Sequence, residues 1–363
     1  MKPYTFCRKS LLIALSIIST VTFTSCQKDF PPIFKDGDGK SGKPVVLVAG
    51  YESNGVNNVA KFWINDEEVI LSDGTNDAEA YSIFVKGNNT YVAGTDSGQP
   101  VYWYNNTEIR LPVKFTRMYP FHNSSANSIF IKGNDTYIAG NDSTRAVYWK
   151  NGTEIILDIT NAKGNFDYST ANSVFISGND IYVAGTHGAN AVYWKNGVEV
   201  YLTNLSTDVA GSADANSIYV SGGNVYIVGN SSSISQTSPL TNYWINGIDE
   251  AATLNNSNFE FFVIHSVFVS GNNIYIGGAG KTEIPPFSGA VYWNNGNVTA
   301  LLSNTNNIIS TASSIYVKGN GVYLSGFDED TNHQIYAVYW KNGTEVKLTD
   351  GTRNAFATSI FIK

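Results

Sequence analysis

The feature that most constrains the fold is an internal repeat with a period of about 45 residues. Between residues 126 and 157, the segment Ala-Asn-Ser-Ile-Phe-Ile-Lys-Gly-Asn-Asp precedes Tyr-Ile-Ala-Gly, then Ala-Val-Tyr-Trp-Lys-Asn-Gly, then Glu-Ile-Ile-Leu. The same order recurs along the chain. All tryptophans occupy one repeat position, namely Trp63, Trp103, Trp149, Trp194, Trp244, Trp293 and Trp340. Such a period, with four strand-like pieces per repeat, is typical of β-propeller blades.

The pieces of each repeat have the composition of β-strands. They are short, rich in β-branched and aromatic residues, and alternate in polarity. Asn-Gly and Gly-Asn pairs between them, such as Asn151-Gly152, provide the positive φ angles that tight hairpins need. No segment shows a sustained helical period. The sequence therefore predicts an all-β fold, a seven-bladed β-propeller with four-stranded blades.

The two ends of the repeat region predict how the ring closes. Residues 358–363 read as a first strand without its successors, and residues 45–50 as a second strand without its predecessor. Pairing the C-terminal strand with the N-terminal strands completes a seventh blade and removes exposed sheet edges. We expect the first strand of each repeat to lie nearest the axis, with the tryptophan strand farther out.

A serine also recurs in every repeat: Ser82, Ser128, Ser173, Ser217, Ser266, Ser314 and Ser359. A residue that is needed seven times is more consistent with architecture than with a nucleophile. We expect these serines to form local hydrogen bonds at the strand starts. By the same reasoning, the tryptophans are expected to fill the core between blades and not to stack on a ligand.

The N-terminal residues have the layout of an export signal. A basic start is followed by the apolar run 11–23, which is shorter than the roughly 20 residues that span a membrane. Phe-Thr-Ser-Cys at 23–26 resembles the lipobox of bacterial lipoproteins, whose cysteine is acylated. We therefore expect a lipoprotein signal peptide at 1–25, a lipidated Cys26 with a flexible tether at 26–44, and the propeller at 45–363.

Two further segments resemble bacterial surface lipoproteins. Gln27-Lys28-Asp29 is similar to the signal that directs lipoproteins of Bacteroidota to the outer face of the outer membrane. The Tyr-Trp-Lys-Asn-Gly and Ser-Ile-Phe-Val-Lys-Gly-Asn elements resemble a repeat in lipoproteins of the same group, over residues 45–363. The resemblance implies a lipid-anchored propeller on the outer membrane that faces the cell exterior. It implies no activity and no site residues.

Composition excludes two classes of feature. Cys7 and Cys26 are the only cysteines, and the first would leave with the signal peptide, so no disulfide framework is expected. Removal of residues 1–25 would leave 20 basic and 30 acidic residues, a net charge of −10. Because basic patches supply the affinity for nucleic acid, a nucleic-acid partner is not expected.

The connections between strands differ in how they vary. Turns from first to second and from third to fourth strand are short and alike, whereas the other connections vary and share the opposite face, where binding commonly resides. This face carries unusual aromatic and basic residues: Phe115, Arg117, Tyr119, Phe121, Phe166, Tyr168, Phe261 and Phe262. They are candidates for a partner surface. Alternatively, the loops fold down and bury these side chains as local cores.

A second candidate is a ring of residues at the start of the innermost strands. Its members are mostly polar: Tyr81, Asn127, Asn172, Asn216, His265, Ser313 and Thr358. These side chains could line the entrance of an axial channel and hold a ligand or water. They could equally cap the ends of the strands.

Catalysis and cofactors have little support in the sequence. His122, His187, His265 and His333 fall in separate repeats or loops, so we expect no metal site. Residues 37–44 approach a phosphate-binding loop but end on proline, with no strand before them, so no cofactor is expected. The sequence favours a non-catalytic surface protein, a binding or scaffold subunit of an outer-membrane assembly that recognises a protein. A glycan-binding lectin is the alternative, and a channel-centred hydrolase is less favoured.

Overall fold

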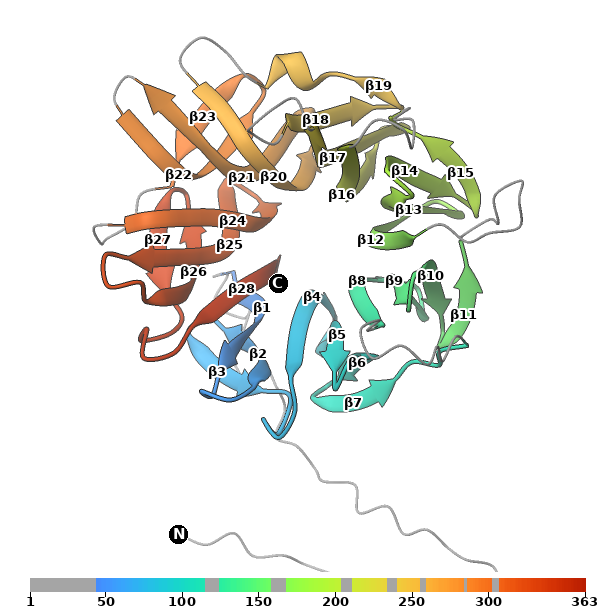
Figure 1. The fold of residues 1–363 in the computed structure, drawn as a ribbon, viewed down its shortest axis with the longest axis horizontal. Coiled ribbons are helices and arrows are strands. Elements are labelled where there is room, and N and C mark those ends of the chain that lie inside the picture. Colours follow the sequence, from blue (N-terminus) through green and yellow to red (C-terminus); the bar gives the residue numbers. More distant parts are fainter. Residues whose placement is uncertain are drawn as a thin grey trace, which may run out of the picture. The chain divides into compact units, whose positions relative to one another are not determined.

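The structure, a computed structural model, describes residues 44–114, 124–157, 168–203, 211–233, 240–254, 259–283, 286–301 and 307–363. Within these residues the chain forms 28 β-strands and one short 3₁₀-helix, η1 (Ala251–Thr253). The strands make seven four-stranded sheets arranged as blades around an axis (Figure 1). The predicted seven-bladed propeller is confirmed. The predicted signal peptide and Cys26 lie outside the described residues.

Blades 1 to 3 follow one another along the chain, and each runs from its innermost to its outermost strand. Their strands are β4 (Ala78–Lys86), β5 (Asn89–Asp96), β6 (Gln99–Tyr104) and β7 (Thr107–Arg110); β8 (Ser125–Lys132), β9 (Asp135–Asp142), β10 (Arg145–Lys150) and β11 (Thr153–Ile156); β12 (Ser169–Ser177), β13 (Asp180–His187), β14 (Asn190–Lys195) and β15 (Val198–Tyr201).

Blades 4 to 6 continue this order in the second half of the chain. Their strands are β16 (Gly211–Ser221), β17 (Asn224–Ser233), β18 (Leu240–Ile245) and β19 (Ile248–Asp249); β20 (Phe259–Ser270), β21 (Asn273–Glu283), β22 (Pro286–Asn294) and β23 (Asn297–Ala300); β24 (Asn307–Lys318), β25 (Gly321–Asp330), β26 (Ile335–Lys341) and β27 (Thr344–Lys347).

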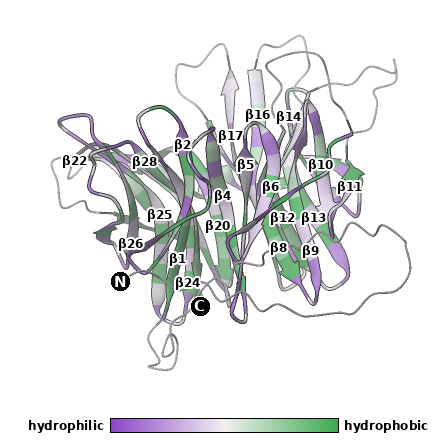
Figure 2. Ribbon diagram, turned by 90° about the horizontal axis from the view of Figure 1, so that it is seen from below, coloured by the Kyte–Doolittle hydropathy of each residue, from purple (hydrophilic) through white to green (hydrophobic). Residues whose placement is uncertain are grey.

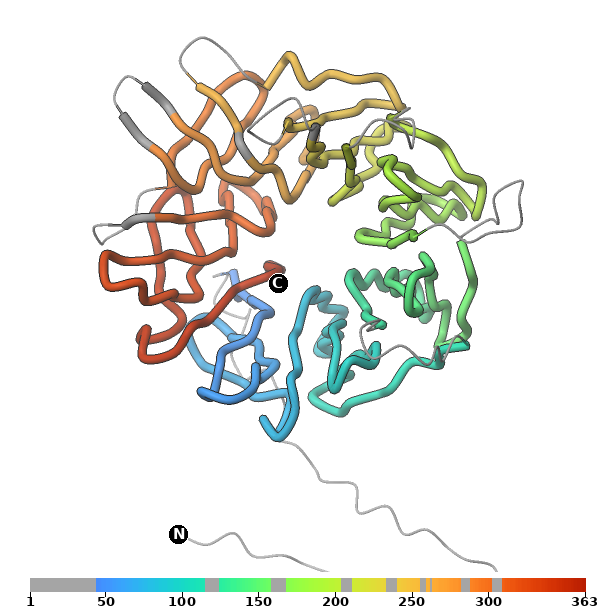
Figure 3. The backbone as a smooth tube through the Cα atoms, viewed as in Figure 1, coloured from blue at the N-terminus to red at the C-terminus, as the bar shows by residue number. Residues whose placement is uncertain are grey.

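Blade 7 joins the two ends of the repeat region. Its strand order is β28 (Ala355–Ile362), β1 (Val46–Ser53), β2 (Asn58–Ile64) and β3 (Glu67–Ile70). β28 runs antiparallel to β1, and the backbones of Val45 and Lys363 exchange hydrogen bonds of 3.0 and 2.9 Å. The red end of the tube therefore lies against its blue beginning in Figure 3. The prediction of one C-terminal and three N-terminal strands is confirmed.

The two faces of the ring differ as the sequence predicts. The face formed by the turns from first to second and from third to fourth strand, called the turn face, has two-residue connections throughout the described residues. Each turn between the third and fourth strands of a blade contains an asparagine with positive φ. Its side chain accepts a hydrogen bond from a backbone N–H at the start of the second strand, for example Ile181 N–H to Asn196 Oδ1 at 2.9 Å. The opposite face, called the loop face, carries connections of unequal length: β5–β6, β9–β10 and β13–β14 are also joined by two residues, whereas β1–β2 and β25–β26 are joined by four.

The hydrophobic core is divided into clusters between adjacent blades. Six of the seven tryptophans are at most 1% exposed and Trp293 is 6% exposed, in clusters that combine side chains of adjacent blades. Hydrophobic colour follows the strands in Figure 2, while the turns are hydrophilic. The prediction that the tryptophans belong to the inter-blade core is confirmed.

The recurring serines form a closed ring of bonds between blades. In each case the residue that follows the serine of one blade donates its backbone N–H to the Oγ of the serine in the preceding blade. The donor–acceptor distances are 3.1 to 3.4 Å. Ile83 of blade 1 donates to Ser359 of blade 7, which completes the circle. Their architectural role is therefore confirmed. The expectation of local hydrogen bonds is wrong, because the partner belongs to the next blade.

Candidate functional site

The proposed loop-face residues fall into three groups. Five of them lie outside the described residues: Phe115, Arg117, Tyr119, Phe121 and Phe166. Tyr168 is 56% exposed just before β12, as a partner surface requires. Phe261 is 2% exposed and packs edge-to-face on Phe259 with 4.8 Å between ring centroids. Phe261 therefore follows the local-core alternative, and Phe262 lies beside it in β20 at a shift of the strand register.

The seven proposed entrance residues share one backbone feature. Each is the extra residue of a β-bulge in the innermost strand, so the register skips it: Tyr81, Asn127, Asn172, Asn216, His265, Ser313 and Thr358. A bulge leaves its residue outside the regular ladder and redirects the side chain. The structure thus places all seven at equivalent positions around the ring.

Side chains in this bulge ring also join adjacent blades. Asn127, Asn172 and Asn216 donate to the backbone oxygen just before the next blade's bulge, at 3.0, 3.1 and 2.8 Å. Thr358 donates similarly to Ala80 at 2.7 Å. These four side chains are therefore at least partly structural. His265 differs, because burial lowers its pKa and favours the neutral imidazole.

A cavity opens on the loop face between blades 6 and 7. This loop-face cavity has a volume of about 730 Å³ and is bounded by β1, β2, β3 and β27 and by their loop-face connections. Its lining contains four acidic and three basic side chains: Glu52, Glu68, Asp73, Asp350, Lys61, Lys347 and Arg353. A cavity of this size with convergent charges suits a strongly hydrophilic ligand.

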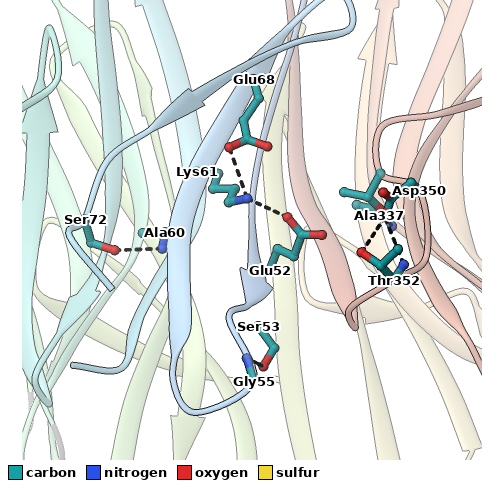
Figure 4. Close-up of polar contacts among 11 residues, drawn as sticks. Glu52, Ser53, Gly55, Ala60, Lys61, Glu68, Ser72, Ala337, Asp350 and Thr352 are labelled. Atoms are coloured by element: carbon teal, nitrogen blue, oxygen red, sulfur yellow. Dashed lines mark hydrogen bonds and ion pairs between the residues drawn. The ribbon is translucent and has the colours of Figure 1, made fainter. Parts of the chain in front are cut away.

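A lysine between two carboxylates forms the inner wall of the loop-face cavity. The Nζ of Lys61 lies 2.5 Å from Glu52 Oε2 and 3.1 Å from Glu68 Oε1 (Figure 4). Burial alone would lower the pKa of Lys61, but its hydrogen bonds with Glu52 and Glu68 outweigh burial and raise it. Lys61 is therefore a cation, and the three side chains together carry a net charge of about −1.

The rim of the cavity is held in place by its own side chains. Asn54 and Asn57 donate to Gly74 O at 2.9 and 3.2 Å, which ties the β1–β2 loop to the β3–β4 connection. On the other side Asp350 accepts hydrogen bonds from Thr352, visible in Figure 4, and these lower the pKa of Asp350. Such bonds fix the loop positions before any ligand arrives.

Arg353 supplies the exposed donor at the mouth of this cavity. A Cβ placed on Gly55 would lie 3.0 Å from its Nη1, so the guanidinium sits directly over that glycine. Within the described part of the chain, Arg353 has no hydrogen-bonded or ion-paired partner. Its planar fork of donors is therefore available to ligand groups such as carboxylates or hydroxyl oxygens.

A smaller cavity of about 360 Å³ lies where blades 7, 1 and 2 meet on the loop face. Glu79 is its central acid, accepting hydrogen bonds from Tyr81 OH at 2.7 Å and from Asn58 Nδ2 at 2.6 Å. Burial and the charge of Glu79 raise the pKa of Tyr81, so the phenol stays protonated. This cavity reaches the bulge ring through Tyr81.

The loop-face cavity is not predicted from the sequence, although one position of the repeat indicates it. The position two residues before each tryptophan is valine in five repeats and asparagine in one, and only Lys61 is charged. A charge at a position that is otherwise uncharged and mostly apolar marks an altered blade. Which acids face Lys61 depends on the register in which β1 and β3 pair with β2.

Two searches for other functional features give negative results. In the described ranges, no group of three or more His, Cys, Asp or Glu side chains is arranged to hold a metal ion. Across the same ranges, no helix has the length and apolarity needed to cross a membrane.

Comparisons with known proteins give only distant structural similarities. No protein-family model and no curated protein sequence matches the chain. The β-propeller domain of the Trilobed protease from Pyrococcus furiosus is 11% identical, with a TM-score of 0.46, covering 85% of this chain and 93% of that domain. A putative 6-phosphogluconolactonase from Bacteroides fragilis is 10% identical, with a TM-score of 0.41, covering 88% and 98%. Likeness at this level carries no argument about function.

Proposed function

We propose that this protein is a lipid-anchored, non-catalytic binding protein of the bacterial outer surface that holds its partner on the loop face. The loop-face cavity is the observation that carries the proposal. It combines a fixed rim, opposing charges and an exposed guanidinium on the face whose connections vary most. Variable loops on a rigid scaffold are the usual place for recognition.

The anchor and the location rest on the N-terminal sequence. Cys26 would carry the lipid, and residues 27–44 would give the propeller freedom to orient its loop face toward a partner. The resemblance to Bacteroidota lipoproteins supports display on the outer membrane. In this proposal the partner is an exposed segment of an outer-membrane protein, and the chain acts as a subunit of that assembly.

A glycan is the second candidate partner, and the lining of the loop-face cavity favours it. Carboxylates, a lysine and an arginine in one cavity can accept and donate hydrogen bonds to several sugar hydroxyls. The cavity occurs at one blade junction, so this proposal is for a single glycan site and not for one pocket per blade.

Affinity capture from native outer membranes tests the main proposal. The full chain serves as bait beside Arg353→Ala, which removes the exposed guanidinium, and Lys195→Ala, which removes an exposed turn-face lysine paired with Asp180 at 3.1 Å. We expect the same membrane protein to be retained by wild type and by Lys195→Ala, and to be depleted with Arg353→Ala. Equal retention by all three baits would contradict recognition through this cavity.

A separate binding experiment tests the glycan alternative. Purified wild type and Arg353→Ala are compared on surface polysaccharides from the same cells, without membrane protein. Binding by wild type that is lost in Arg353→Ala, together with no captured protein, would favour the glycan over the protein partner.

A further inference from the structure

Seven aromatic side chains form a closed collar around the propeller axis. Each innermost strand contributes one ring, two residues after the recurring serine: Phe84, Phe130, Phe175, Tyr219, Phe268, Tyr316 and Phe361. Every ring contacts the rings of both neighbouring blades, with centroids 4.6 to 5.2 Å apart. All seven are half-buried. Each ring packs against the core cluster between its own blade and the next, so its remaining exposed part faces the axis.

The ring planes of this aromatic collar stand parallel to the axis. Successive planes are inclined by 46 to 55°. Neighbouring blades are rotated by one seventh of a turn, about 51°, and upright rings would show that same angle. The centroid spacing places the rings about 6 Å from the centre, which leaves an opening of about 4 to 8 Å after van der Waals contact is allowed for. An alkyl chain or one flat ring fits such an opening.

A basic arc borders the collar on the turn face. Two residues beyond the aromatic position, four consecutive blades carry lysine, and the other three carry serine: Lys318, Lys363, Lys86 and Lys132, against Ser177, Ser221 and Ser270. Lys318 and Lys363 reach the next blade at Ile362 O, 3.4 Å, and Asn88 Oδ1, 2.9 Å, and Lys86 reaches Gly133 O. The four lysines therefore lie at equivalent positions of neighbouring blades, and three of them reach toward the next blade.

Three of the four lysines in this arc lack an acidic partner among the described residues. They are Lys86, Lys132 and Lys318. Asp135 and Asp180, the acids in the neighbouring turns, are instead engaged by asparagines and by Lys150 and Lys195. A chain with a net charge of −7 thus exposes a local cationic arc next to an apolar collar.

We propose that the aromatic collar and the lysine arc together bind a small anionic amphiphile. Its apolar part lies inside the collar, and its carboxylate, sulfate or phosphate group lies at the arc. Alternate residues of a strand are about 6.6 Å apart, so the head group and the first few carbons of the tail span the two rings. Charge complementarity selects the head, and aromatic contacts select the tail. This site is on the opposite side from the loop-face cavity and does not depend on the proposed partner.

Calorimetric titration of the full chain with three probes tests the proposal. Octyl sulfate has both parts of the ligand, octyltrimethylammonium has the same tail with the opposite charge, and inorganic sulfate has the head alone. All are used below the concentration at which they form micelles. We expect one octyl sulfate per chain, bound at least about tenfold more tightly than either other probe, and weaker binding at high salt.

Charge-removing variants locate the site. Lys86→Gln, Lys132→Gln and Lys318→Gln combined should weaken octyl sulfate at least about tenfold, whereas Lys150→Gln with Lys195→Gln, on the same face but paired with acids, should not. Phe130→Leu should weaken it too, with the unliganded melting temperature measured to confirm folding. Equal binding of both octyl probes, several molecules per chain, or no effect of the triple variant would overturn the proposal and leave the collar as packing only.

Discussion

At the scale of the residue, Lys61 shows how one substitution within a repeat changes a blade junction. Equivalent positions in other blades hold valines such as Val147 and Val192, which are fully buried. Lys61 is 8% exposed and is accommodated because Glu52 and Glu68 approach it from two strands. A cation in such a site is favourable only while both carboxylates accompany it.

Lys61→Val is therefore expected to destabilise the protein although valine is the common residue at this position. The change leaves Glu52 and Glu68 facing each other without a cation. We expect a loss of about 2 to 4 kcal/mol, below the range for a fully buried pair because the Glu68 side chain is 38% exposed. Urea denaturation measures this loss. Lys195→Val, at an exposed ion pair, is the control and should lower the free energy of unfolding much less.

Phe261 offers a second test at this scale. A ring that is 2% exposed and packed on Phe259 belongs to the folding core. Phe261→Ala should lower the free energy of unfolding by about 3 to 5 kcal/mol. Tyr168→Ala, at a ring 56% exposed, should change it by at most about 0.5 kcal/mol. Similar melting temperatures for the two variants would contradict the assignment of Phe261 to the core.

His265 is expected to make stability depend on pH. Burial lowers its pKa from 6.5, so the unfolded chain binds the proton more readily than the folded one. The stability linked to His265 is present above about pH 6.5 and is lost as the pH falls toward its folded pKa. His265→Asn, the residue found at three equivalent bulges, should reduce this loss. Melting curves between about pH 8 and pH 5 compare the two proteins; identical pH profiles would exclude the histidine as the cause.

The role of a residue can be predicted from the sequence where the residue recurs in every repeat. The tryptophans, serines and turn asparagines recur seven-fold, so their architectural roles were readable. Phe261 is aromatic and lies next to a variable loop, and nothing in the sequence separates an exposed ring from a buried one. The acids around Lys61 come from the strands on either side of it, and the register of these two hairpins decides which side chains face the lysine.

At the scale of the element, the bulged innermost strand explains an invariant glycine. The second strand of every blade carries one glycine facing the bulge of the first strand: Gly50, Gly94, Gly140, Gly185, Gly229, Gly278 and Gly326. A Cβ on Gly140 would overlap the carbonyl oxygen of Ser125 and lie 3.0 Å from the Trp149 ring. Sequence periodicity predicted the strands but not the bulges, because an extra residue leaves the composition of a strand unchanged.

Gly140→Ala should consequently disrupt blade 2. The added methyl group meets backbone, which cannot rotate away, so we expect a loss of at least about 3 kcal/mol in the free energy of unfolding. Gly152→Ala is the matched control. It has a positive φ of 77° but open space around the Cβ position, so only backbone strain of about 1 kcal/mol should appear. Chemical denaturation of both variants separates steric overlap from strain, and equal losses would argue against the close approach at the bulge.

At the scale of the whole molecule, three closed sets of contacts run through every blade. The serine ring, the aromatic collar and the inter-blade cores each require seven members to close. β28 supplies the closing member of the first two through Ser359 and Phe361, and it supplies Ile360 to the core. A defect in this strand therefore opens all three sets of contacts at one place.

Deletion of residues 358–363 tests this closure. The deletion removes the pairing of β28 with Val46 to Ala49 and leaves Ile83 N–H without Ser359. Because each blade is stabilised mainly by its neighbours, we expect the cooperative thermal transition to be lost or lowered across the whole propeller. Scanning calorimetry and hydrogen exchange measure it, and a synthetic peptide of residues 355–363 should restore it in part. Val198→Ala, at a side chain that is 67% exposed in blade 3, is the control. A cooperative melt unchanged by the deletion would mean that the blades hold together without a closed ring.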